Sequence, residues 1–118
     1  MNSEAMSNRD RFLAYLRAYE SRDIDRVADL LADDVSLRDW KIAVQGKAAA
    51  VAETKANFEA AGSIEIQPLR LNAGEASVAG ELRILVDDSI ELFVVDVLEF
   101  NPQGKISAIR AFLGRGDG

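Results

Sequence analysis

The spacing of apolar residues changes once along this 118-residue chain, and that change constrains the fold more than any other feature. Before residue 62 they recur mainly every three or four residues, as on amphipathic helices. After residue 63 they alternate with polar residues, as in strands with one buried face. The sequence therefore predicts an α+β fold, in which three N-terminal helices pack on a curved, mostly antiparallel sheet. We expect this cone-shaped α+β barrel to enclose a pocket.

Capping residues and apolar stripes predict the three helices. The first follows Ser7, a residue type that caps helix N-termini, and the second begins near Asp23. The third runs through residues 48–61, after Gly46 breaks the chain. A short strand over residues 35–40 is expected between the second helix and the third.

The second half of the chain predicts strands separated by turns. Pro68 shifts the alternation of the first strand, which indicates a bulge or a bend. The next strand runs through residues 76–86, and the one after it contains Asp96. A tight turn at residues 101–104 leads to a last strand that extends through Phe112.

Length and composition indicate one soluble domain over residues 1–118, with residues 114–118 as a loose tail. Apolar residues make up 48% of the chain and charged residues 29%, which is typical of a globular protein. No apolar run approaches the roughly 18 residues that a bilayer crossing needs. The N-terminal residues lack the apolar stretch of a secretory signal, so we expect a cytoplasmic protein.

The charge and two missing residue types exclude several classes of function. The net charge is −6 and the basic residues are scattered, so neither a nucleic-acid nor a membrane partner is expected. The chain has no cysteine and no histidine, which removes disulfides, thiol nucleophiles, Ser-His-Asp triads and almost every zinc site. Proton transfer near neutral pH would therefore fall to carboxylates, tyrosines or lysines with displaced pKa values.

Two aspartates stand in apolar rows of predicted strands. By alternation Asp96 shares a face with four large apolar side chains, those of Leu92, Val94, Leu98 and Phe100. Asp39 similarly ends a row that begins with Val35 and Leu37. Burying a carboxylate is costly, and a raised pKa lets the group stay protonated and donate a hydrogen bond.

Taken singly, these residues have ordinary explanations. Asp96 is equally compatible with structural hydrogen bonding and with function, and Asp39 near a strand end is most often a turn or capping residue. Tyr15 on an amphipathic helix is more often a core residue whose hydroxyl reaches a backbone group.

Two segments resemble the ketosteroid isomerases of the nuclear-transport-factor-2-like (SnoaL-like) superfamily: AYLRAYESRDIDRVADLLADDVSLRDW and VVDVLEFNPQGKISAIRAFLG. The resemblance implies that Tyr15 hydrogen-bonds the substrate oxygen, that Asp39 moves the proton, and that Asp96 is a protonated second donor. It also implies that no metal or organic cofactor is required. The family usually has proline after the catalytic aspartate, whereas this chain has Trp40, whose indole could close the pocket mouth or pack outside.

The implied function is isomerisation of a hydrophobic, steroid-sized ketone by proton transfer next to its carbonyl group. Alternatives are another superfamily reaction, such as polyketide cyclisation, or a non-catalytic dimer that binds an apolar ligand. Epoxide hydrolysis is less expected, because it calls for an Asp-Arg-Asp arrangement and only Arg110 lies on a strand face with apolar neighbours. The predicted pocket-lining residues are Phe12, Trp40, Phe58, Leu98 and Phe112.

A homodimer is also expected from the resemblance, because these folds pair through the open face of the sheet. Phe93, Val95 and Val97 would supply an apolar patch on that face.

Overall fold

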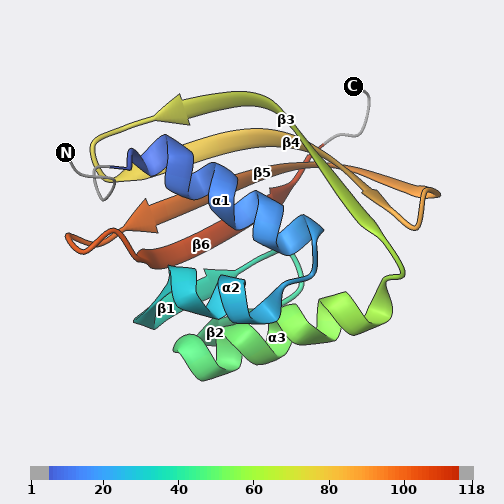
Figure 1. Cartoon of the computed structure of the whole chain (residues 1–118). Helices are drawn as coiled ribbons and strands as arrows, with labels where there is room; N and C mark the ends of the chain where they lie inside the picture. Colours follow the sequence, from blue (N-terminus) through green and yellow to red (C-terminus); the bar gives the residue numbers. More distant parts are fainter. Residues whose placement is uncertain (1–5, 115–118) are drawn as a thin grey trace.

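A curved six-stranded sheet carries three helices on one side in the computed structural model, which describes residues 6–114 (Figure 1). Apart from Gly114, the predicted loose tail lies outside the described residues. In chain order the elements are α1 (Asn8–Glu20), α2 (Ile24–Leu30), β1 (Leu31–Arg38), β2 (Ala43–Gln45), α3 (Lys47–Ala60), β3 (Ile64–Ala73), β4 (Ser77–Val86), β5 (Ile90–Phe100) and β6 (Ile106–Leu113).

The strands lie in the order β2-β1-β6-β5-β4-β3, and every neighbouring pair is antiparallel except β1 with β6. Helix α1 packs against β3 and β4, whereas α3 packs against β1 at the other end of the sheet. Figure 1 shows how the sheet bends so that β3 descends toward the end of α3. These features confirm the predicted α+β fold with a mostly antiparallel sheet.

The predicted helix starts are confirmed by their caps. The Ser7 hydroxyl accepts a hydrogen bond from the Asp10 N–H (3.0 Å), and the Asp23 carboxylate accepts one from the Arg26 N–H (3.1 Å). Gly46 precedes α3 with a φ of +93°, a backbone conformation that favours glycine.

The predicted strand over residues 35–40 needs correction at both ends. The strand β1 begins four residues earlier, and it ends at Arg38 because the chain reverses direction directly after it. The Asp39 N–H donates to the Ile42 carbonyl (3.0 Å), which closes a turn that leads into β2. With only three residues, β2 has too little alternation to be predicted from the sequence. The predicted irregularity at Pro68 is confirmed by a register shift between Pro68 and Arg70.

The core forms where α1 crosses β4. Phe12 is fully buried, and its ring occupies the space above Gly80. A Cβ atom at position 80 would lie 2.6 Å from Phe12 Cζ and 2.8 Å from Leu71 Cδ2, so only glycine admits this close approach. The other large, fully buried side chains are Leu31, Leu82, Leu98, Ile106, Val27, Val35 and Val78.

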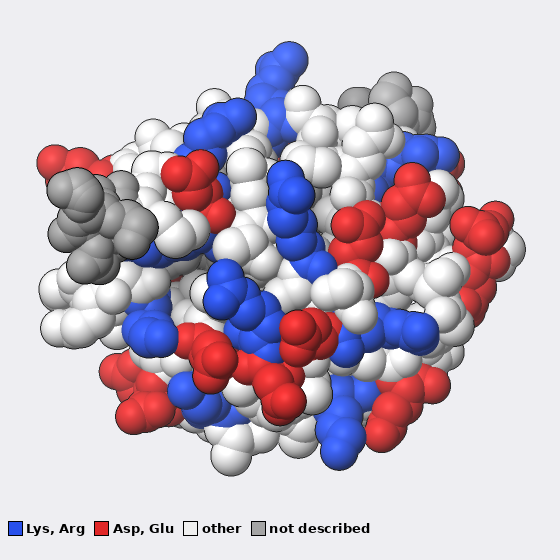
Figure 2. Space-filling model, viewed as in Figure 1, with Lys and Arg blue, Asp and Glu red and all other residues white. Residues whose placement is uncertain are grey.

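Acidic and basic side chains are interspersed over the face that carries the helices (Figure 2). Within residues 6–114, no helix has the length and apolar character needed to cross a bilayer.

Candidate functional site

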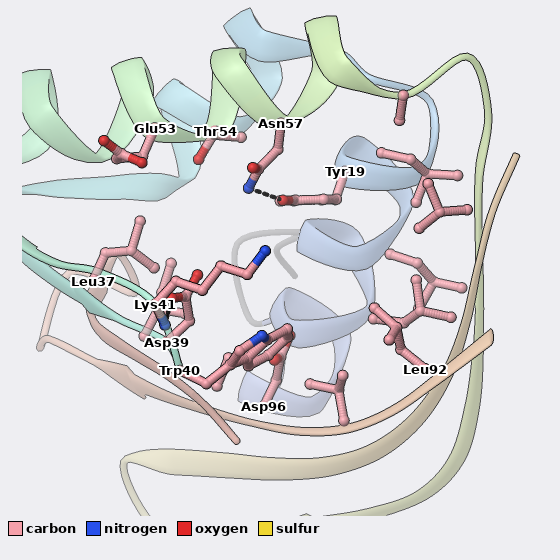
Figure 3. A pocket seen from close by; sticks show the side chains of 18 of the residues that line it. Tyr19, Leu37, Asp39, Trp40, Lys41, Glu53, Thr54, Asn57, Leu92 and Asp96 are labelled. Carbon is pink, nitrogen blue, oxygen red and sulfur yellow. Dashed lines mark hydrogen bonds between the residues drawn. The ribbon is translucent and has the colours of Figure 1, made fainter. Parts of the chain in front are cut away.

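A cavity of about 410 Å³ lies between α1, α3, the turn after β1 and the inner face of the sheet. Its volume is within the range of small-molecule sites. One part of its lining is aliphatic and comes from β3, β4 and β5: Ile64, Ile66, Ile84, Val86 and Leu92. The rest of the lining includes polar and aromatic side chains from α1, α3, β5 and the 39–42 turn (Figure 3).

Asp96 projects into this cavity from the middle of β5. Its partners on the neighbouring strands are Gly80 on β4, where the ring of Phe12 occupies the space of a side chain, and Ala111 on β6, which has only a methyl group. No hydrogen bond links the Asp96 carboxyl to another described residue, and its oxygens open on the cavity. A ligand in the cavity can therefore reach it.

The environment of Asp96 favours its neutral form. Burial, and to a smaller extent the negative charge of Asp39, raises the pKa of Asp96 from 3.8 to about 7. Near neutral pH a substantial fraction of the group is a carboxylic acid, which can donate a hydrogen bond. A raised pKa is what the sequence predicts for an acid on a strand face that is otherwise apolar.

Asp39 reaches the same cavity from the turn after β1. Its Oδ1 accepts hydrogen bonds from the Lys41 N–H (2.7 Å) and the Ile42 N–H (2.9 Å). These two donors hold the carboxyl group in a fixed orientation at the cavity wall. Asp39 is therefore a turn residue, as its position alone suggested, and also faces Asp96 across a shared space.

Tyr15 and Tyr19 face the cavity from successive turns of α1, with ring centroids 5.9 Å apart. Burial raises the pKa of Tyr15 well above its usual value, with further contributions from Tyr19 and Asp96, so its hydroxyl remains a hydrogen-bond donor. Burial also raises the pKa of Tyr19, while a hydrogen bond from Asn57 Nδ2 to the Tyr19 hydroxyl (3.0 Å) opposes that effect.

The structure brings together four residues predicted for the site: Tyr15, Asp39, Trp40 and Asp96. Trp40 remains 42% exposed while lining the cavity, so its indole lies at the mouth and does not pack elsewhere on the surface. Trp40 therefore covers part of the entrance to the cavity.

Four predicted pocket-lining residues lie elsewhere. Phe12 and Leu98 are fully enclosed in the core, and Phe58 is buried with its ring against Tyr19 at 4.9 Å between centroids. Phe112 is 54% exposed, because it pairs with Val95 on β5 and not with Asp96. Its neighbour Ala111 is the one that pairs with Asp96 and lines the cavity.

Sequence reasoning missed the polar side chains opposite Asp96. Glu53, Thr54 and Asn57 line the cavity from α3, and Lys41 does so from the turn. Residues three and four positions apart share a helix face, so the spacing of the α3 residues was a usable signal, but only once that face was known to meet a cavity. In residues 6–114 no group of three or more metal-ligating side chains is found.

Comparisons with known proteins agree with this architecture. Residues 12–109 match the SnoaL-like domain family. Among solved structures, the epoxide hydrolase/cyclase-like enzyme SalBIII, which acts in pyran ring formation in polyether salinomycin, is 25% identical with a TM-score of 0.80, covering 93% of this chain and 92% of its own.

Two more distant structures share the fold. A candidate ketosteroid isomerase from Kribbella flavida DSM 17836 is 22% identical with a TM-score of 0.80, covering 94% of this chain and 80% of its own. A candidate polyketide cyclase from Sinorhizobium meliloti is 17% identical with a TM-score of 0.78, covering 94% of this chain and 99% of its own. By sequence, the chain matches no curated protein. The match over residues 12–109 and the shared architecture show that the chain belongs to the SnoaL-like domain family, of the nuclear-transport-factor-2-like fold.

Proposed function

We propose that the protein is an isomerase that moves a proton from the carbon next to a ketone, through an enolate intermediate. The observation that carries this proposal is the arrangement of Asp96. Burial favours its neutral form, its carboxyl has no hydrogen-bond partner among residues 6–114, and it lies next to Tyr15 and across the cavity from Asp39. A hydrophobic small molecule is the expected substrate, because aliphatic residues line a large part of the cavity.

In this mechanism the Asp39 carboxylate removes the proton, and negative charge develops on the carbonyl oxygen. The Tyr15 hydroxyl and the protonated Asp96 carboxyl donate hydrogen bonds to that oxygen. Such donors, fixed before the reaction begins, typically contribute about 10²–10³ in rate each. Asp39 then returns the proton to a different carbon of the substrate, so that a double bond moves without net gain or loss of atoms.

A β,γ-unsaturated 3-ketosteroid provides the direct test, because its conversion to the conjugated enone is visible as ultraviolet absorbance. We expect turnover above the buffer rate and its loss in Asp39→Asn. Turnover that is absent, or that Asp39→Asn leaves unchanged, would refute the proposal. Binding of the steroid without turnover would instead support the non-catalytic alternative, in which the cavity holds an apolar ligand.

Acid–base opening of an epoxide is a second candidate, favoured by the 25% identity to SalBIII over nearly the full length of both chains. Asp96 could protonate the epoxide oxygen while Asp39 takes the proton of an attacking hydroxyl group. The expected Asp-Arg-Asp arrangement is not found, however, because no arginine of the described residues lines the cavity and its cationic side chain is that of Lys41. Arg110 forms an ion pair with Glu99 (2.7 Å) instead. Incubation with a hydroxy-epoxide, followed by mass spectrometry and chromatography, distinguishes cyclic ether from unreacted material.

A further inference from the structure

The wall of the cavity formed by α3 is polar, in contrast to the aliphatic part of the lining. Glu53, Thr54 and Asn57 face the cavity from one side of α3, and Tyr19 of α1 joins them through its hydrogen bond with Asn57 (Figure 3). We refer to these four residues as the α3 wall. The isomerisation proposed above needs none of their polar groups.

Hydrogen bonds within the α3 wall determine what it can offer a ligand. Asn57 Nδ2 donates to the Tyr19 oxygen at 3.0 Å, so the hydroxyl hydrogen of Tyr19 is not used in that bond. The Thr54 hydroxyl donates to the Ala50 carbonyl at 2.8 Å, which leaves its oxygen as an acceptor. Asn57 Oδ1 and the Glu53 carboxylate are acceptors as well. The α3 wall therefore combines two free donors, the Tyr19 O–H and the second N–H of Asn57, with several acceptors.

A hydroxyl group is the ligand function that suits this combination, since it both accepts and donates a hydrogen bond. A ketone or an ether could use only the donors and would leave the acceptors without a partner. A carboxylate would approach the negative charges of Glu53 and Asp39, with Lys41 as the opposing cation in the described lining.

We infer that the α3 wall is a second polar subsite, which binds a hydroxyl group of the substrate while Tyr15 and Asp96 hold its carbonyl oxygen. This inference rests on the proposed function and narrows the substrate class to a neutral, hydroxylated apolar ketone. The hydroxyl group sits on the side of the molecule that faces α3, away from the end enclosed by the aliphatic side chains.

Four naphthalenes that differ only at position 6 test the subsite by isothermal titration calorimetry at neutral pH. They are 2-naphthol, 2,6-dihydroxynaphthalene, 6-methoxy-2-naphthol and 6-hydroxy-2-naphthoic acid. Because a hydrogen bond to a charged acceptor is stronger than one between neutral groups, we expect the second hydroxyl group to tighten binding about tenfold over 2-naphthol. The methoxy compound, which cannot donate, should gain much less.

Variants of the α3 wall identify the source of that gain. Glu53→Ala and Tyr19→Phe should each remove most of the affinity gain that the second hydroxyl group gives. Glu59→Ala is the matched control, because Glu59 is an exposed carboxylate of the same helix that does not line the cavity. It should leave the full tenfold gain in place.

Several results would overturn the inference. One is equal affinity for 2-naphthol and 2,6-dihydroxynaphthalene. A second is an affinity gain that survives both Glu53→Ala and Tyr19→Phe. A third is no measurable binding of the dihydroxy compound. Tightest binding of the naphthoic acid, abolished by Lys41→Met, would instead identify an anion subsite. Steroid turnover is measured in a separate experiment. Turnover without the affinity gain from the second hydroxyl group rejects the subsite alone. The affinity gain without turnover rejects the proposed isomerisation alone.

Discussion

Asp96 and Gly80 lie opposite each other on neighbouring strands, and the ring of Phe12 fills the space that a side chain at position 80 would occupy. Because directly opposed residues of a sheet have Cβ atoms about 5 Å apart, this places an aromatic ring close to the base of the acid. Phe12 does not line the cavity, yet it helps to exclude water from one side of Asp96. The packing of α1 and the acidity of the site are therefore linked.

Replacing Gly80 tests this packing. Gly80→Ala should lower the free energy of unfolding by about 1–3 kcal/mol, since the added methyl group must displace Phe12 or Leu71. Urea denaturation measures the loss. Gly74→Ala serves as a control, because its Cβ would meet Ser77 Oγ at an ordinary 3.4 Å. A cost for Gly80→Ala no greater than that of the control would contradict the assigned role of the glycine.

Replacing Asp39 tests the proton acceptor. In Asp39→Asn the side-chain oxygen can still accept from the Lys41 and Ile42 N–H groups, so the turn should be retained. We expect turnover to fall by about 10²–10⁴, the usual contribution of a general base, with product affinity nearly unchanged. Asp34→Asn, at an exposed position of β1, should have no such effect. Steady-state kinetics and product inhibition separate the two quantities.

The rate should depend on pH through Asp96. Its carboxyl group donates a hydrogen bond only while protonated, so kcat/KM should decline as the pH rises through about 7. Asp96→Asn retains an N–H donor that does not ionise, and its profile should lack this decline. A wild-type profile that stays level through this region, or a decline that persists in Asp96→Asn, would assign the titration to another group.

Stability should depend on pH through the same residue. In the unfolded chain Asp96 loses its proton near pH 3.8, whereas in the native state it keeps it until about pH 7. Between these values the native state binds more protons, so this group lowers the free energy of unfolding as the pH rises. Asp96→Asn lacks this penalty and should be more stable than the wild type, by on the order of a few kcal/mol above about pH 7 and by little near pH 4.

Denaturation at these two pH values measures that difference. The control is again Asp34→Asn, which replaces an exposed carboxylate that does not line the cavity. If Asp96→Asn is equally stable or less stable than the wild type at the higher pH, the acid is not held neutral by burial.

Association of two chains through the outer face of the sheet is a further expectation. Val95 pairs with Phe112 there, and the exposed Phe112 extends the apolar patch predicted around Phe93. Sedimentation velocity should show a dimer that Val95→Lys converts to a monomer. Ile90→Lys, at an exposed apolar position near the β4–β5 turn, should remain dimeric. A wild-type monomer at micromolar concentration would refute the expectation.

Alternation and capping predicted the parts of the structure that local sequence determines. Asp96 was found in this way, because the side-chain period of a strand is two residues. Asp39 was chosen by the same rule, but it lies in the turn after β1, and the hydrogen bonds of that turn orient it. The aromatic pocket residues were chosen by residue type, and type does not distinguish a core position from a cavity wall. Phe112 illustrates the limit: a register difference of one residue exchanges the two faces of a strand.

The polar part of the cavity lining depends on tertiary placement, which the sequence does not show. Whether Glu53 and Asn57 meet a ligand or only solvent is decided by where α3 lies relative to the turn after β1. Tyr19 shares a helix face with Tyr15, but its contact with Asn57 joins residues 38 positions apart. Contacts of that separation have no local signature.

The hydrogen bonds that hold Asp39 have an evolutionary consequence. Its own loop supplies both donors, and an amide oxygen could accept them as well, although more weakly. A protein of this family could therefore replace Asp39 by asparagine during evolution, lose the proposed proton transfer and keep its cavity. Enzymes and inert ligand carriers of this architecture could then be separated by a single codon.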